Sequence, residues 1–350
     1  MSSRIMMQSE WDQETFLVHL RENHDDKTDD CERKLTFLSL LIYLYSNRKN
    51  KVSFIFHCQS SLPYLVLSFY FKKIFKLDGF QLIYDIHDLH EIDINGRGII
   101  ANIKGYLRYY VFLYLENILV KKVCIKIMTV SNGIAKYYEK KHNINNPIVV
   151  RNVGNNINAS EFFSDKERYE KDLLFFGKPE RIPFEIFQAC NDQDINIHLY
   201  GKGVKDAVEV FHNSLGNRLN NINSHGPYEP NDLEFLKNYR YLLLYKPNDL
   251  RLNYKYSLPN KFFQAISYGI SIVVSPNFNE MIDLFGHIPG AIVVVDNEKD
   301  LNSLITENNK YRTENFFSTY NKSITLIHNK TKKDYLELSQ NNSCKFNTDE

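Results

Sequence analysis

The fold is decided by residues 52–86, which read VSFIFHCQSSLPYLVLSFYFKKIFKLDGFQLIYDI. Val52–His57 is a short apolar run typical of a strand, and Phe80–Ile86 is a second one. The stretch between them has helical character and begins at a natural N-cap, Ser60 or Ser61. A strand, a helix and a strand in this order predict a parallel sheet in an α/β protein.

The same alternation continues along the chain and is interrupted once. The polar segment RNVGNNINAS at residues 151–160 is rich in Asn and Gly, as linkers are. After it, the alternation restarts with a strand at Asp172–Phe176. The 350 residues therefore predict two Rossmann-like domains, 1–153 and 154–330, that face a cleft, with a polar tail at 331–350. The last helix is expected to pack back on the first domain.

Composition narrows the class of protein. Lys and Arg number 43 and Asp and Glu 42, so the net charge of +1 disfavours a dedicated nucleic-acid binder. The five cysteines share no CxxC spacing, which indicates neither a disulfide framework nor a zinc site and favours a reducing compartment. No stretch is long and uncharged enough to span a bilayer. We expect a cytoplasmic protein.

The segment YDIHDLHE, residues 84–91, is the first candidate site. Five of its eight side chains ionise, which a buried strand would not tolerate, so we expect it to line a cleft or loop. A hydrogen-bonded turn in which Asp88 caps the next segment remains open. A metal site is disfavoured, because the spacing of His87, His90 and Glu91 is not the helical HExxH arrangement.

The segment GKPER at residues 177–181 is the second candidate. It follows the strand 172–176, and the backbone can approach a ligand closely at Gly177. Lys178 and Arg181 supply positive charge for an anion. The alternative is a solvated turn before a helix.

The third candidate is the start of a helix predicted at 258–268. Ser257 is a natural N-cap, Pro259 fits the first turn, and Gly269 suits a left-handed residue after the last turn. Free N–H groups around Pro259–Lys261, together with the helix dipole, form an anion site. The alternative is a capped core helix with no ligand.

Four segments together resemble a known family. VSNGIAKYYEKKHNI, IVVRNV, LLFFGKPER and YSLPNKFFQAISYGISIVVS follow one another in the order found in retaining glycosyltransferases of the GT-B fold. The resemblance is to family 4 (glycosyl transferases group 1), which builds bacterial surface polysaccharides. YDIHDLHE also looks like the acceptor-domain motif of that group. The match runs from about Val52 to Pro276.

The resemblance implies a hexosyltransferase that moves a sugar from a nucleoside-diphosphate sugar to a saccharide acceptor, lipid-linked in O-antigen, capsule or lipopolysaccharide synthesis. It implies no metal and no cofactor. His87 and Asp88 would be catalytic, with His87 near the transferred sugar. The donor-binding residues would be Gly177, Lys178, Arg181, Ser257, Leu258, Pro259, Asn260, Lys261 and Gln264.

Departures from the family leave alternatives open. Tyr256 and Gln264 stand where the family often carries two Glu residues. The first glycine is Gly79, so the glycine-bearing loop that opens the family's acceptor domain is missing, and this domain is abbreviated or an N-terminal piece is absent. A non-catalytic homologue that binds a partner or a nucleotide remains an alternative, as does a nucleotide-sugar epimerase.

Two further segments have a functional and a structural interpretation. Tyr228 would stack on the nucleotide base or be an ordinary turn aromatic. Residues 104–126 combine apolar and basic side chains, which suits either a peripheral helix on the anionic inner face of the plasma membrane or a core helix with solvated ends.

Overall fold

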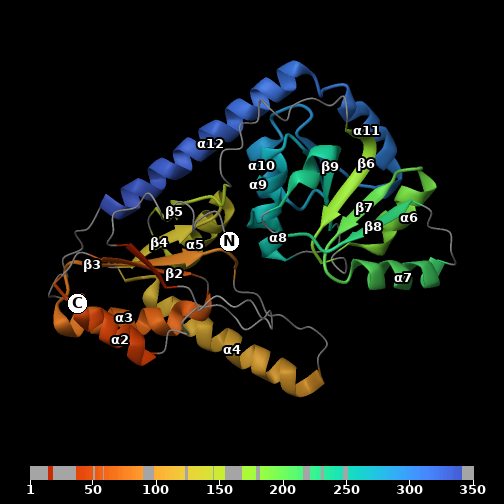
Figure 1. Cartoon of the computed structure of the whole chain (residues 1–350). Helices are drawn as coiled ribbons and strands as arrows, with labels where there is room; N and C mark the ends of the chain where they lie inside the picture. Colours follow the sequence, from red (N-terminus) through yellow and green to blue (C-terminus); the bar gives the residue numbers. More distant parts are fainter. Residues whose placement is uncertain are drawn as a thin grey trace. The chain divides into compact units, whose positions relative to one another are not determined.

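The fold consists of two compact units, shown in Figure 1. The N-terminal unit comprises residues 4–151 with 331–350, and the C-terminal unit comprises residues 152–330. The computed structural model describes residues 15–18, 37–49, 52–57, 59–89, 98–122, 125–144, 146–153, 168–178, 182–215, 221–229, 232–246 and 251–340.

The N-terminal unit is built on a five-stranded sheet in which all neighbouring strands are parallel. Its strands lie side by side in chain order: β1 (Thr15–Val18), β2 (Val52–His57), β3 (Phe80–Ile86), β4 (Ile125–Thr129) and β5 (Ile148–Val149). Its helices are α2 (Phe37–Ser46), the short 3₁₀ helix η2 (Gln59–Ser61), α3 (Leu62–Phe75), α4 (Gly98–Leu119) and α5 (Asn132–His142). The sequence analysis missed β1.

Local signals explain where these helices begin. Ser131 caps α5, because its hydroxyl accepts a hydrogen bond from the N–H of Ile134 at 3.1 Å. Ser61 stands at the N-cap of α3 without a side-chain cap bond, since the 3₁₀ turn η2 precedes it.

The two faces of the N-terminal sheet are covered by different elements. Helices α2, α3 and α4 lie on one side (Figure 1), where Tyr43 of α2 contacts Phe54 of β2 edge to face. On the other face, Tyr335 and Leu338 of α12 (Glu314–Gln340) pack with Ile55, Ile83, Met128 and Val150. Residues 331–340, expected to belong to a polar tail, instead form the last turns of α12, where Tyr335 and Leu338 are buried.

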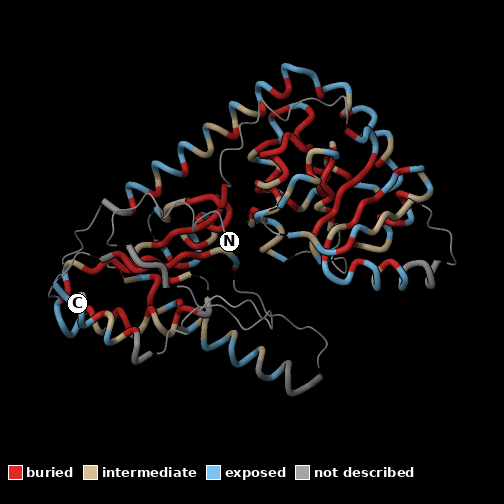
Figure 2. Tube along the Cα trace, viewed as in Figure 1, coloured by how far each residue is buried: buried red, intermediate tan, exposed pale blue. Residues whose placement is uncertain are grey.

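The C-terminal unit contains a six-stranded parallel sheet, in which the central strands Tyr239–Leu244 and Ser271–Val274 are mostly buried (Figure 2). Its order is β11-β10-β9-β6-β7-β8, with β6 (Tyr169–Phe176), β7 (Ile197–Tyr200), β8 (Ile222–Gly226), β9 (Tyr239–Leu244), β10 (Ser271–Val274) and β11 (Ile292–Val294). The chain adds strands on one side of β6 and then on the other. The order therefore reverses between β6 and β9, and ligands of doubly wound sheets bind at the carboxyl ends beside such a point.

The helices of this unit flank the sheet on both faces, where two separate apolar clusters form. They are α6 (Phe184–Asp192), α7 (Val204–Leu215), η5 (Glu234–Asn238), α8 (Leu252–Tyr256), α9 (Asn260–Ser267), α10 (Asn279–Phe285), η6 (Glu298–Asp300), α11 (Leu301–Asn309) and the first part of α12. None of the helices in the described ranges combines the length and apolar character needed to cross a bilayer.

Helix α9 does not begin as the sequence suggested. Ser257 ends α8 instead of capping α9, since its N–H bonds to the carbonyl of Asn253 at 2.8 Å. Pro259 occupies the N-cap of α9 and offers no side-chain acceptor to the first-turn N–H groups. At the other end Gly269 is left-handed, with φ +68, as the sequence predicted.

Two buried arginines hold the carboxyl end of α9. Arg168 donates to the carbonyl of Tyr268 at 2.7 Å, and Arg312 donates to the carbonyl of Gly269 at 2.9 Å and to the hydroxyl of Ser271. Both guanidinium groups also face the negative end of the helix dipole, which cations stabilise. The position of α9 against the sheet is thus fixed at its last turn.

We expect the substitution Arg312→Met to lower the free energy of unfolding by about 2–4 kcal/mol, because two charge-assisted hydrogen bonds are lost and buried acceptors remain. Urea titration followed by circular dichroism measures the change. Lys322→Met, an exposed cation on α12, is the matched control and should change stability by less than about 0.5 kcal/mol. Equal effects of the two substitutions would contradict the role of Arg312.

Candidate functional site

Glycines end three adjacent strands of the C-terminal sheet. Gly177 follows β6, Gly201 follows β7 and Gly226 is the last residue of β8, all with positive φ. The N–H of Gly177 bonds to the carbonyl of Tyr200 at 2.7 Å, and that of Gly201 to Gly226 at 2.7 Å. A Cβ on Gly201 would lie 2.0 Å from the carbonyl oxygen of Gly177, so the two backbones touch here and a side chain is excluded.

A lysine from α9 lies over the first of these glycines. The Nζ of Lys261 is 4.9 Å from the ring centroid of Phe175 and 5.3 Å from that of Phe176, the last residues of β6. A Cβ added to Gly177 would come within 2.0 Å of this Nζ. The ammonium group that the first turn of α9 carries therefore lies against the glycine backbone beside the strand-order reversal. This combination can bind an anion.

The other predicted donor-binding residues have different environments. Lys178 is exposed directly after Gly177, whereas Arg181 lies outside the described residues. The side chain of Leu258 is 2 % exposed and belongs to the core, so it can offer a ligand only its backbone. Asn260 is exposed in the first turn of α9 and Gln264 is half-buried one turn later.

Tyr228 belongs to a cluster of aromatic rings. It meets Phe176 edge on, with centroids 5.6 Å apart, and also contacts Phe235 at 5.7 Å. Phe235 stacks on Tyr200 at 4.2 Å. Burial raises the pKa of the Tyr228 hydroxyl. The cluster lies beside the glycine ends of β6 and β7, and the sequence analysis missed the contribution of Tyr200 and Phe235 to it.

The N-terminal sheet carries a second constellation at its carboxyl edge. Residues 57 and 85 are direct partners in the register of β2 and β3, and residue 87 lies two positions beyond 85, so all three side chains share one face. His57 Nδ1 is 2.8 Å and His87 Nε2 is 3.0 Å from Asp85 Oδ2. These three residues could hold a metal ion, since one ligand atom from each lies within 4.8 Å of the others.

This constellation corrects the expectation for the segment 84–91. Asp85 is 1 % exposed inside a fully buried strand, which is tolerated because two imidazoles bond to its carboxylate. Asp88 is exposed, and its carbonyl accepts a hydrogen bond from Gln59 at 3.2 Å. His90 and Glu91 lie outside the described residues. One feature of the sequence could have identified His57: it is the last residue of β2, the strand before the one that contains Asp85.

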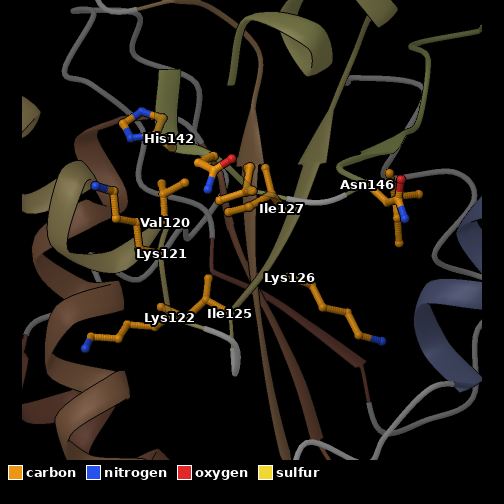
Figure 3. A pocket seen from close by; sticks show the side chains of 11 residues that line it. Val120, Lys121, Lys122, Ile125, Lys126, Ile127, His142 and Asn146 are labelled. Carbon is orange, nitrogen blue, oxygen red and sulfur yellow. The ribbon is translucent and has the colours of Figure 1, made fainter. Parts of the chain in front are cut away.

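A cavity of about 650 Å³ lies at the opposite end of the same sheet, where β4 and β5 begin. Figure 3 shows that the side chains of Lys121, Lys122 and Lys126 extend from it in different directions, so their charges do not converge on one anion. His142 also lines it and is 3 % exposed. Burial, with the nearby charges of Lys141 and Lys121, lowers the pKa of His142 to about 4.

Glu116 of α4 is buried beside this histidine. Its carboxylate accepts hydrogen bonds from the hydroxyls of Tyr84 at 3.2 Å and of Tyr138, and it lies 3.7 Å from Lys141 Nζ and 3.9 Å from His142 Nε2. Burial raises the pKa of Glu116. Glu116 therefore faces the core and is not part of the exposed, basic surface of α4.

Comparisons with known proteins find matches in structure but not in sequence. No protein-family model matches this sequence, and no curated protein does. TarM matches with 16% identity and a TM-score of 0.59 over 87% of this chain and 58% of its own. Anabaena HepE in complex with UDP has 12% identity and a TM-score of 0.58 over 86% and 82%. WaaG, a glycosyltransferase involved in lipopolysaccharide biosynthesis, has 11% identity and a TM-score of 0.50 over 87% and 95%.

The fold is that of the GT-B glycosyltransferases. The predicted α/β class with parallel sheets is thereby confirmed. The chain spans 58% of the length of TarM, so the likeness to TarM covers just over half of that protein.

The pKa of His142 gives a prediction for stability. Below its ordinary value of 6.5, the unfolded histidine takes up a proton while the folded one stays neutral down to about pH 4. The free energy of unfolding should therefore fall as the pH drops from 6.5 to 4, by up to about 3 kcal/mol from this residue. The variant His142→Gln lacks this contribution.

Urea titrations of both proteins between pH 7 and 4 measure the effect. The difference in unfolding free energy between wild type and variant should shrink as the pH falls. Glu116, whose raised pKa acts in the opposite direction, is present in both proteins and cancels. Parallel stability curves would contradict a neutral, buried His142.

Proposed function

We propose that the protein transfers a hexosyl group from a nucleoside-diphosphate sugar to a saccharide acceptor. The observation that carries the proposal is the position of Lys261 over Gly177, beside the point where the strand order of the C-terminal sheet reverses. This edge of a doubly wound sheet is where nucleotides bind. A cation, helix N–H groups and a bare glycine backbone suit a diphosphate.

The same groups would act in the reaction. The departing diphosphate gains negative charge in the transition state, and fixed cations and amides stabilise it there. Lys178 and Lys261 supply the charge, joined by Arg181. Ser257 offers its hydroxyl and Asn260 its backbone N–H to the phosphates, whereas Pro259, which has no N–H, starts the helix turn that presents Asn260. We propose that with these groups the diphosphate needs no metal ion and the enzyme no cofactor.

The remaining assignments complete the proposal. His87 and Asp88 act on the sugar and the acceptor, with retention of the anomeric configuration. HepE has been solved with UDP and with UDP-glucose, so we take a uridine diphosphate sugar as the first donor to test. Gln264 contacts the donor ribose and Tyr228 its base. WaaG is involved in lipopolysaccharide biosynthesis, and we propose a comparable role here, in O-antigen, capsule or lipopolysaccharide synthesis.

A lipid-linked acceptor would bring the protein to the inner face of the plasma membrane. Helix α4 exposes apolar side chains at helical spacing, with Leu107 65% and Tyr114 66% exposed. The full set is Ile103, Tyr106, Leu107, Tyr110, Val111 and Tyr114. Arg108 on the same helix and Lys121 just beyond it are exposed cations. An apolar stripe flanked by cations favours an anionic lipid surface.

We expect Lys261→Met and Lys178→Met each to weaken the binding of UDP-glucose by about tenfold or more, because a charge-assisted contact to phosphate is lost. Isothermal titration calorimetry measures the dissociation constant. Lys205→Met, an exposed cation on α7, is the control and should bind as wild type.

The outcome separates the alternatives. Unchanged affinity for UDP-glucose in both variants would contradict the proposal that Lys178 and Lys261 bind the diphosphate. If wild type binds UDP-glucose but transfers no sugar to lipid-linked acceptors, the chain is a binding module. If the sugar is isomerised without an acceptor, it is an epimerase. Absence of binding by uridine, guanosine and adenosine diphosphate sugars contradicts the proposal as a whole.

The membrane assignment predicts that Leu107→Glu reduces binding to vesicles containing phosphatidylglycerol by about tenfold, since a charge replaces an apolar contact with the lipid. Co-sedimentation measures the bound fraction. Leu326→Glu on α12 places the same charge at a leucine that is 60% exposed in the other unit, and it should bind as wild type. Equal binding by all three proteins would remove α4 from the membrane proposal.

A further inference from the structure

We propose that His57, Asp85 and His87 form a binding site for a divalent transition-metal ion of the zinc class in the N-terminal unit. The residue types are those that zinc prefers, two imidazoles and a carboxylate. This set differs from His87 with His90 and Glu91, whose spacing in the sequence disfavours a metal site. The fold instead brings together one residue from β2, one from β3 and one from just beyond β3.

The two imidazoles lie around the carboxylate of Asp85. Both imidazoles direct a nitrogen at the same carboxylate oxygen, Asp85 Oδ2, from 2.8 and 3.0 Å. Their ring centroids are 4.0 Å apart and the ring planes are inclined by 73°. Ligands of a tetrahedral zinc ion, bound at about 2.0–2.1 Å, lie about 3.3 Å from one another. Both N···O distances are within about half an ångström of this separation, and all three ligand atoms lie within 4.8 Å of one another, so small side-chain adjustments would admit the ion.

Burial and access also fit an ion. Asp85 is 1 % exposed, so its position is fixed by the surrounding strands, whereas the side chains of His57 and His87 are 20% and 16% exposed. Three protein ligands leave a coordination position open, and the partial exposure of the two imidazoles shows that solvent reaches the cluster. A bound cation would also neutralise the buried carboxylate.

A second histidine–aspartate cluster in the same chain shows the difference. In the C-terminal unit, His198 lies between Asp172 and His225, with Nε2 2.9 Å from Asp172 Oδ2 and Nδ1 2.9 Å from His225 Nε2. The two ring nitrogens of His198 bond to different partners on opposite sides of the ring. The three side chains therefore do not direct ligand atoms at one position, as a metal ion would require. This cluster provides a matched control with the same residue types.

The inference does not rest on the proposed function, because metal binding is measured without any sugar. The site also lies in a different unit from the proposed diphosphate seat. The two proposals share His87: absence of metal binding would leave the transfer reaction standing, whereas a bound ion would make His87 a metal ligand instead of a group that acts on the sugar.

The test uses the full chain without a histidine tag, treated with EDTA and dialysed. Titration with Co²⁺ should produce saturable visible absorption with one equivalent bound, which Zn²⁺ should then bleach because zinc binds more tightly than cobalt. Zn²⁺ should also raise the melting temperature of wild type. His57→Gln and His87→Gln keep a polar group of similar size, and each should weaken Co²⁺ binding by about tenfold or more.

His225→Gln is the control and should bind Co²⁺ within about twofold of wild type. Melting curves in EDTA verify that all variants are folded. Wild-type protein that shows only the spectrum of aqueous Co²⁺ overturns the proposal. Equal Co²⁺ affinity in wild type, His57→Gln and His87→Gln overturns it as well, because any bound Co²⁺ would then lie at a different site.

Discussion

The hydrogen bonds from Arg168 and Arg312 to the last turn of α9 are the constraint on which the C-terminal site depends. Two buried guanidinium groups hold the carbonyls of Tyr268 and Gly269, so α9 cannot slide along the sheet without stranding buried charge. Its first turn is thereby kept at the end of β6, and Lys261 stays over Gly177. The buried last turn of α9 and its first turn at the edge of the sheet therefore belong to one rigid helix, so the core fixes the position of the site.

Much of this architecture can be read from local sequence. Gly269 was recognised from the sequence because a left-handed φ after the last turn of a helix depends on one residue and its immediate neighbours. The role of Ser257 was predicted wrongly. Its N–H bonds to the end of the short helix α8, which hydrophobic periodicity alone does not reveal. Lys178 and Lys261 were both named from the sequence, but only the tertiary structure shows that the ammonium of Lys261 lies against Gly177.

Asp85 shows why the other site could not be predicted. An isolated carboxylate in a strand is expected at the surface, since its burial costs several kcal/mol without partners. The partners come from 28 residues earlier and two residues later, and they meet it only through the register of β2 with β3. Strand pairing thus converts three separate sequence positions into one compact set of donors and acceptors.

The last turns of α12 carry a consequence for how the protein is made. Tyr335 and Leu338 complete the apolar layer on one face of the N-terminal sheet, and the amide of Gln81 bonds to the carbonyl of Leu338 at 2.9 Å. Leu338 follows Gln81 by 257 residues, and the whole C-terminal unit lies between them in the chain, so this part of the core can form only after that unit has been translated. The N-terminal sheet therefore cannot complete this apolar layer from its own neighbouring residues and depends on a segment that the chain reaches only beyond the C-terminal unit.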